Sequence, residues 1–124
     1  MKTDNIVRDK SFEFAVRIVN LQQYLCSERR EYVLSKQILR SGTSVGANIH
    51  EAIQGVSKKD FVYRMNISLK EAGETEYWLK LFKRTGLLSE EEFESLNHDC
   101  EELIRLLTAI VKTSRNRSVQ QELK

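Results

Sequence analysis

Apolar residues recur at helical spacing in four stretches of the chain, and short polar or glycine-containing breaks separate these stretches. Because successive residues of an α-helix turn by about 100°, this periodicity predicts amphipathic helices. The predicted helices cover residues 9–26, 31–55, 57–85 and 89–114. Long helices with short connections favour antiparallel neighbours, so the pattern predicts an all-α fold, an up-and-down antiparallel four-helix bundle.

The first predicted helix is apolar over a wider arc than a single neighbouring helix requires. Its apolar residues fall on two adjoining faces. One face comprises Phe12, Ala15, Val16, Val19 and Cys26, and the other comprises Phe14, Ile18, Leu21 and Leu25.

The second predicted helix combines an apolar stripe with a run of small residues at positions 41–47. The stripe comprises Leu34, Ile38, Val45, Ile49, Ala52, Ile53 and Val56. Gly42 and Gly46 lie inside this helix, where each glycine costs about 1 kcal/mol relative to alanine. We therefore expect another backbone to approach the helix closely at this segment.

The third predicted helix starts with a capping box at Ser57 and Asp60 and stops at Gly86. It carries two apolar stripes on nearly opposite sides. The first comprises Phe61, Met65, Leu69, Ala72 and Leu79, and the second comprises Tyr63, Ile67, Trp78 and Leu81. The second stripe predicts an interface between copies of the chain. The alternative is that this helix lies deepest in the core.

The fourth predicted helix opens with a capping box at Ser89 and Glu92 and carries one apolar stripe, which is typical of an outer helix. The stripe comprises Phe93, Leu96, Cys100, Leu103, Leu107, Ile110 and Val111. Because the stripe ends there, we expect one domain over residues 1–114 and a flexible C-terminal tail over residues 115–124.

Composition agrees with a globular, proline-free helical domain: 40% of the residues are apolar and 31% are charged. No run of about 18 apolar residues is present, and residues 1–10 lack the apolar region of a secretory signal. We therefore expect no membrane segment and a cytoplasmic location. In that compartment Cys26 and Cys100 are expected as reduced thiols rather than as a disulfide.

The sequence shows no pattern of an enzyme active site. Glu94 and His98 share the polar face of the fourth helix, but one carboxylate and one imidazole do not hold a metal. His50 flanks the core stripe of the second helix, neither cysteine has a neighbouring base, and no phosphate-binding loop occurs. The sequence therefore predicts a non-enzymatic protein without a metal, a cofactor or a small-molecule substrate.

A polar stripe on the second helix contains Arg40, Asn48 and Glu51. One interpretation is a hydrogen-bonded seam that fixes the register between helices or subunits. The other is a binding surface for a ligand or partner. Periodicity alone does not choose between them.

Basic residues form modest clusters although the net charge is only +2. The clusters comprise Arg29, Arg30 and Lys36; Lys58 and Lys59; and Lys80, Lys83 and Arg84. Charged residues usually solvate a helical surface, but assembly of several chains would repeat each cluster and add the fields. Such a surface would bind RNA or DNA through phosphates, with strong salt dependence.

The segment Gln37–Glu51 resembles the signature of the 23S rRNA-intervening sequence protein family, in which Gln-Ile-x-Arg leads through small residues into Asn-Ile-x-Glu. Further matches are Lys58–Phe61, Leu69–Ala72 and Glu74–Leu79, and the resemblance extends from about Ser11 to Lys112. The family's usual glycine after this glutamate is Ala52 in this chain.

The resemblance implies a four-helix bundle that assembles as a ring-like homo-oligomer, a pentamer. It also implies kinship with the accessory protein of diversity-generating retroelements, a more basic pentameric barrel that engages RNA and a reverse transcriptase. The sequence thus predicts a homo-oligomeric binding or scaffolding module that contacts nucleic acid. The alternative is a protein–protein adaptor that receives a partner's helix on Tyr63, Ile67, Trp78 and Leu81 and binds no nucleic acid.

Overall fold

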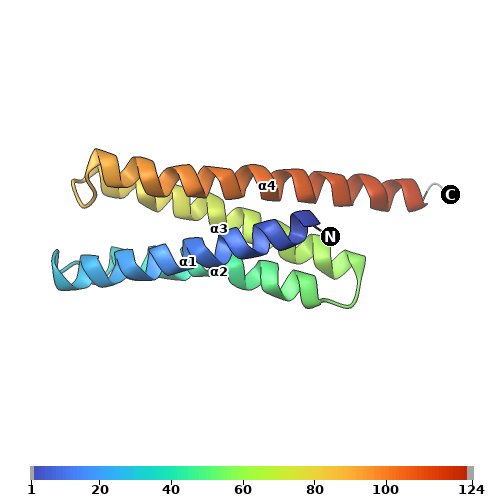
Figure 1. Ribbon diagram of the computed structural model, residues 1–124, viewed down its shortest axis with the longest axis horizontal. Coiled ribbons are helices and arrows are strands. Elements are labelled where there is room, and N and C mark those ends of the chain that lie inside the picture. Colours follow the sequence, from blue (N-terminus) through green and yellow to red (C-terminus); the bar gives the residue numbers. More distant parts are fainter. Residues whose placement is uncertain (1, 123–124) are drawn as a thin grey trace.

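The computed structural model describes the backbone of residues 2–122 and the side chains through Arg117, and it is an antiparallel four-helix bundle (Figure 1). The helices are α1 (Lys2–Ser27), α2 (Leu34–Gln54), α3 (Lys58–Arg84) and α4 (Glu90–Glu122). The predicted all-α fold and its up-and-down order are therefore confirmed. No helix in this part of the chain is both long and apolar enough to cross a membrane.

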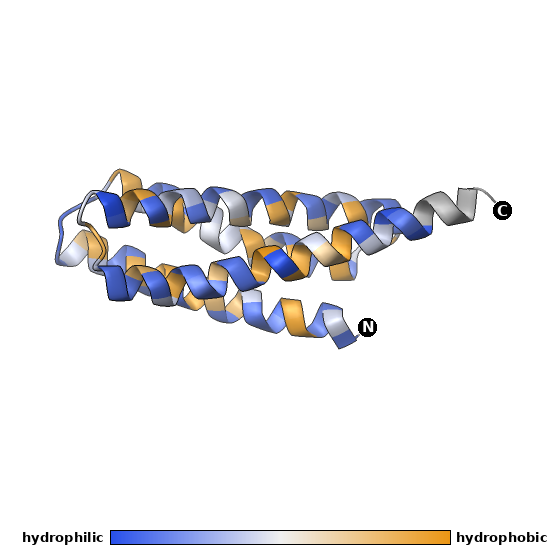
Figure 2. Ribbon diagram, turned by 90° about the horizontal axis from the view of Figure 1, so that it is seen from above, coloured by the Kyte–Doolittle hydropathy of each residue, from blue (hydrophilic) through white to orange (hydrophobic). Residues whose placement is uncertain are grey.

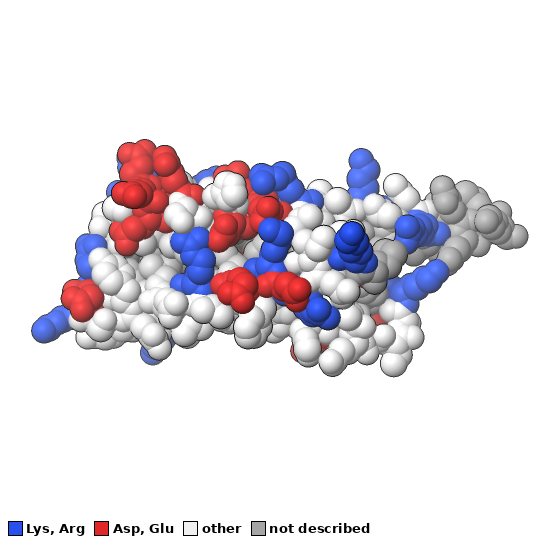
Figure 3. Space-filling view, in the orientation of Figure 1, with Lys and Arg blue, Asp and Glu red and all other residues white. Residues whose placement is uncertain are grey.

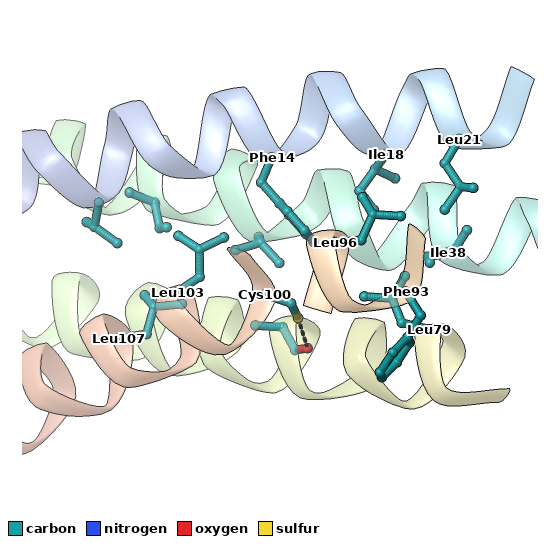
Figure 4. Close-up of a cluster of buried hydrophobic side chains, with 14 of the residues drawn as sticks. Phe14, Ile18, Leu21, Ile38, Leu79, Phe93, Leu96, Cys100, Leu103 and Leu107 are labelled. Atoms are coloured by element: carbon teal, nitrogen blue, oxygen red, sulfur yellow. Dashed lines mark hydrogen bonds between the residues drawn. The ribbon is translucent and has the colours of Figure 1, made fainter. Parts of the chain in front are cut away.

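The helices surround the core in chain order, because α1 packs on α2, α2 on α3 and α3 on α4, whereas α1 and α4 meet least. Polar and apolar residues alternate along every helix (Figure 2), as amphipathic helices require. Their apolar sides form one continuous core (Figure 4). The largest fully buried side chains include Phe14, Ile18, Leu79, Phe82 and Leu103.

One of the two apolar faces of α1 forms its side of the core. Phe14, Ile18, Leu21 and Leu25 are buried, and Val7 and Ser11 continue the same face toward the N-terminus. The face of Phe12, Val16 and Val19 points outward instead. The sequence showed both faces, and the position of α2 decides which of them is covered.

The small residues of α2 bring α1 close, as predicted. A Cβ atom at Gly42 would lie 2.8 Å from two carbon atoms of Ile18, closer than van der Waals contact allows. A Cβ atom at Gly46 would lie 3.3 Å from the carbonyl oxygen of Ser11. Glycine at these positions therefore permits the observed packing of α1 on α2.

The opposite side of the same α2 segment bonds to α3 through buried hydroxyl groups. Ser68 donates to the carbonyl oxygen of Val45 at 2.7 Å, and the hydroxyl groups of Thr75 and Ser41 are hydrogen-bonded to each other at 2.9 Å. All three hydroxyl-bearing side chains are buried. Directional bonds of this kind fix how far α3 can slide along α2.

Local sequence signals mark where helices begin and end. Ser89 and Glu92 form a reciprocal capping box, with Glu92 N donating to Ser89 Oγ at 3.1 Å and Ser89 N donating to Glu92 Oε1 at 2.9 Å. The Asp60 amide donates to Ser57 Oγ at 3.0 Å, and Gly86 follows α3 with a φ of 81°. These predicted signals are confirmed.

Two predicted helix boundaries and one predicted core residue were wrong. Helix α1 begins at Lys2 rather than near Asp9, because Val7 extends its buried face toward the N-terminus. Val56 is fully exposed in the α2–α3 connection and not part of the core. Helix α4 continues to Glu122, beyond the end of its apolar stripe and past the other helices (Figure 1), so helical backbone extends into the predicted tail. The flexibility of residues 115–124 stays a prediction, and residues 123 and 124 lie outside the described part.

Candidate interaction surfaces

The predicted polar stripe of α2 lies along its contact with α3. The Arg40 guanidinium donates to Glu71 Oε2 at 2.9 Å and also binds the Glu74 carboxylate. Glu51 forms an ion pair with Arg64 at 2.9 Å, whereas Asn48 donates to the carbonyl of Ser44 within its own helix. Arg40 and Glu51 thus make the contacts of a seam between α2 and α3, and a ligand role for the stripe stays a prediction.

One carboxylate connects the seam to the predicted interface residues of α3. We call the surface formed by these residues the α3 face; it comprises Tyr63, Ile67, Trp78 and Leu81. Trp78 Nε1 donates to Glu74 Oε2 at 3.0 Å. This bond lowers the pKa of Glu74, with further lowering by Arg40 and opposition from partial burial. The pKa of Arg40 is raised, mainly by its bond to Glu74. Both groups are therefore held in their charged forms on the outside of the bundle.

The predicted interface residues of α3 form a partly exposed face. The Tyr63 side chain is 60% exposed, and Ile67, Trp78 and Leu81 are partly buried. Trp78 also packs against the core, with Tyr77 edge-on to its ring at a centroid distance of 5.1 Å. Helix α3 is therefore not enclosed on all sides by its own chain.

A more exposed apolar surface lies on α1, outside the predicted site residues. Phe12 is 66% exposed, Val16 42% and Val19 38%, and the three residues share one helix face. We call this surface the α1 face. Its signal was present in the sequence as the first of the two adjoining apolar faces, but periodicity does not say which face a neighbour covers.

The structure divides the basic clusters between the two ends of the bundle. The α1–α2 connection lies beside the α3–α4 connection, where Arg29 donates to the carbonyl of Leu87 at 3.4 Å. The first and third clusters thus share one end: Arg29, Arg30 and Lys36 with Lys80, Lys83 and Arg84. Lys58 and Lys59 lie at the other end, where α3 begins.

Acidic residues are distributed unevenly along the bundle. Figure 3 shows that they gather where α4 begins, a segment that contains Glu90, Glu91 and Glu92. Lys and Arg side chains lie along the middle and toward the end of α4 in the same view. Acidic side chains therefore accompany the basic cluster near the α3–α4 connection, whereas Lys58 and Lys59 form no ion pair among the described side chains.

The described side chains include no group of three or more that could hold a metal ion. The buried Cys100 thiol donates to the carbonyl of Ala72 at 3.3 Å (Figure 4), and burial raises its pKa to about 12. Such a thiol is protonated at neutral pH and is a poor nucleophile. Cys26 is also unpaired.

The arrangement defines the class of the protein as an antiparallel helical bundle with exposed apolar and basic surfaces. Its sequence matches the family described as 23S rRNA-intervening sequence protein over residues 3–109, and the chain belongs to that family. The predicted family is thus confirmed.

A crystal structure of a protein from Bacteroides thetaiotaomicron VPI-5482 has the same fold, with a TM-score of 0.87 and 58% sequence identity. The similarity covers 89% of this chain and 98% of that chain. That protein is described as a member of the S23 ribosomal protein family with unknown function. No curated protein matches the sequence.

Proposed function

We propose that the protein is a non-enzymatic, self-associating scaffold that binds the phosphate backbone of RNA or DNA. The observation that carries the proposal is the α1 face, where Phe12, Val16 and Val19 expose apolar surface in one row. Removing apolar surface from water is favourable by about 25 cal/mol per Å². A second copy of the chain is a partner that is always present to cover such a surface.

The α3 face supports a ring rather than a closed pair. Helices α1 and α3 lie diagonally across the bundle, because each of them packs on both α2 and α4. A subunit with two different adhesive faces makes head-to-tail contacts, which close into a ring when the rotation permits. The family resemblance implies five copies. The two unpaired cysteines support the proposed cytoplasmic location.

The solution mass tests self-association. Light scattering is expected to give about five times the 14.5 kDa of one chain, as the resemblance implies. Phe12→Glu is expected to reduce the mass to that of one chain without loss of helicity, because the exposed Phe12 ring is not part of the hydrophobic core. Asn20→Glu, at another exposed position of α1, is the matched control and should keep the native mass. A wild-type monomer would contradict the proposal.

The basic clusters support nucleic-acid binding, because a ring would present each of them several times around one axis. Lys58 and Lys59 are exposed and free of ion pairs among the described side chains, so their charges are available for phosphates. We expect affinity for duplex RNA to fall steeply with salt. The double change Lys58→Glu and Lys59→Glu should weaken binding, whereas Lys58→Arg with Lys59→Arg should preserve it. Binding that ignores salt and charge reversal would refute phosphate contact.

A protein–protein adaptor is the second candidate, and the exposed Tyr63 together with the partly exposed Ile67, Trp78 and Leu81 favours it. An apolar helix-binding face responds little to salt. Two results together would favour the adaptor over the scaffold. The wild-type protein would be a monomer that does not bind RNA. It would also bind a partner protein with an affinity that is insensitive to salt and is lost in Tyr63→Glu.

A further inference from the structure

The residues that line a pocket between α3 and α4 include Asn97, whose buried side-chain oxygen lacks a hydrogen-bond partner. The pocket is an open groove with a volume of about 790 Å³, within the range of roughly 300–1,000 Å³ for small-molecule sites. Its lining from α3 comprises Tyr77, Lys80, Leu81, Lys83 and Arg84, and its lining from α4 comprises Phe93, Asn97 and Glu101.

Asn97 is the unusual member of this lining. Its side chain is 7% exposed, and its Nδ2 donates to Glu101 Oε1 at 2.7 Å. This bond fixes the orientation of the carboxamide, because a flipped amide would place two oxygens against each other. Oδ1 is then a buried acceptor with no hydrogen-bond donor. Buried acceptors in folded proteins are nearly always bonded, so this oxygen is available to a donor from water or from a ligand.

The other residues that line the pocket indicate which chemical groups a ligand bound there would have. Tyr77, Leu81 and Phe93 supply aromatic and apolar walls that suit a flat ring. Lys80, Lys83 and Arg84 supply three positive charges, against one carboxylate from Glu101 in the lining. These residues come from successive turns of two adjacent helices, so they converge on one groove.

Two of the three cations of the pocket have an acidic neighbour, and the third has none among the described side chains. Lys80 and Lys83 each lie 3.7 Å from a glutamate oxygen, of Glu76 and Glu90 respectively, which is longer than a direct hydrogen bond. Arg84 forms no ion pair among the described side chains. Lys83 Nζ lies 4.7 Å from the centroid of the Phe93 ring, at the boundary between the apolar wall and the charged rim.

We propose that this α3–α4 pocket binds a nucleotide: the base lies against Tyr77, Leu81 and Phe93, an N–H of the base donates to Asn97 Oδ1, and the phosphate binds Lys80, Lys83 and Arg84. Because Oδ1 is closed off from solvent, a side chain of the lining must move to admit the base edge. This proposal rests on the proposed nucleic-acid function in one respect only, which is the source of the nucleotide. The nucleotide is either free in solution or part of single-stranded RNA.

The pocket shares four residues with the surfaces proposed above: Leu81 with the α3 face, and Lys80, Lys83 and Arg84 with the basic clusters. Trp78 bonds through Glu74 toward α2, whereas the pocket opens toward α4. Leu81 contributes to both the α3 face and the pocket rim. Lys58 and Lys59 lie at the opposite end of α3 and take no part in the pocket.

Titration with adenosine 5′-monophosphate, followed by the NMR signals of the Asn97 side-chain amide, tests the site directly. We expect these signals to shift, and ribose 5-phosphate and adenosine to bind at least about tenfold more weakly, since each lacks one half of the contacts. Equal affinity for ribose 5-phosphate would overturn the base contact. Absence of any response to the nucleotide would overturn the site.

Variants separate the contacts of the pocket from its shape. Asn97→Leu keeps the size of the side chain and removes the acceptor, so we expect about a tenfold loss of nucleotide affinity with the fold retained. Tyr77→Ala changes an exposed side chain and should cause a similar loss through stacking, even if Asn97→Leu perturbs folding. Lys70→Ala, at an exposed position of α3 outside the pocket and outside the basic clusters, is the matched control and should leave nucleotide affinity unchanged. Unchanged affinity in both pocket variants would refute the proposal, with water as the partner of Oδ1.

Duplex and single-stranded RNA distinguish this site from the proposed function. Tighter binding of a short single strand than of the mononucleotide, with loss in Asn97→Leu, would support the pocket and identify RNA as the source. Nucleotide binding that depends on Asn97, together with single-strand binding that does not, would support the pocket and identify the free nucleotide. Salt-dependent duplex binding through Lys58 and Lys59 without any nucleotide response would leave the proposed function standing and refute the pocket.

Discussion

The two sides of α2 join their neighbours by different means. Toward α1, glycines allow Ile18 and the backbone at Ser11 to approach the helix directly. Toward α3, buried Ser41, Ser68 and Thr75 make hydrogen bonds, and Arg40 and Glu51 form ion pairs at the rim. The first contact depends on shape and the second on matched polar groups. One short segment of small residues, 41–47, thus serves two interfaces with different chemistry.

The largest effect is expected from a substitution that disrupts the close packing of α1 on α2. Gly42→Ala places a Cβ atom 2.8 Å from the buried Ile18 side chain, so overpacking should lower the free energy of unfolding by about 1–3 kcal/mol. Gly73→Ala is the matched control on α3, because a Cβ atom there meets nothing within 4 Å. Alanine should stabilise that site by about 0.5–1 kcal/mol through its helix propensity. Urea unfolding measures both changes, and equal signs would contradict the close-approach argument.

The next effect is expected from a substitution that removes the buried hydrogen bond between Thr75 of α3 and Ser41 of α2. Thr75→Val leaves Ser41 Oγ buried without its partner, and we expect a loss of about 1–3 kcal/mol. Adding Ser41→Ala should recover part of the loss, because both polar groups are then absent. Thr108→Val is the control: its hydroxyl bonds the carbonyl four residues earlier, as Thr75 does, but on an exposed surface. A double-mutant cycle without coupling would show that the bond does not link the helices.

A smaller effect is expected at the rim of the same interface. Arg40→Met keeps much of the side-chain length and removes the charge that binds Glu71 and Glu74. Because these groups are partly exposed, the loss should be no more than about 1 kcal/mol. It should shrink further in high salt, which screens exposed pairs. Thermal unfolding at two salt concentrations checks this, and a large salt-independent loss would contradict a rim position.

The smallest effect concerns acid stability. The pKa of Glu74 is lowered in the folded state, first by the Trp78 hydrogen bond and then by Arg40. Its contribution to stability is therefore complete above the pKa of the unfolded chain and is lost as the pH falls through the lower, folded pKa. Glu74→Gln should flatten the decline in stability below about pH 4.5, near the ordinary glutamate value. An identical acid profile in the variant would show that Glu74 makes no such contribution.

The sequence sufficed for the helices and for the small-residue contact because both depend on local patterns. Ser89 and Glu92 act within one helical turn, and Gly42 and Gly46 are recognisable by their position inside a helix. The choice between the Phe12 and Phe14 sides of α1 depends on where α2 lies, which no local pattern specifies. For the same reason the sequence did not reveal Asn97, whose missing donor is apparent only when the surrounding side chains are placed.

The order of the helices around the core has a consequence for how the chain folds. Each extensive interface joins helices that follow one another in the sequence, and the first and last helices meet least. Such a topology has a low contact order, and helical proteins of this kind fold in microseconds to milliseconds. The α2–α3 pair, which has the most extensive packing and a short connection, is the natural nucleus on which α1 and α4 condense from either side.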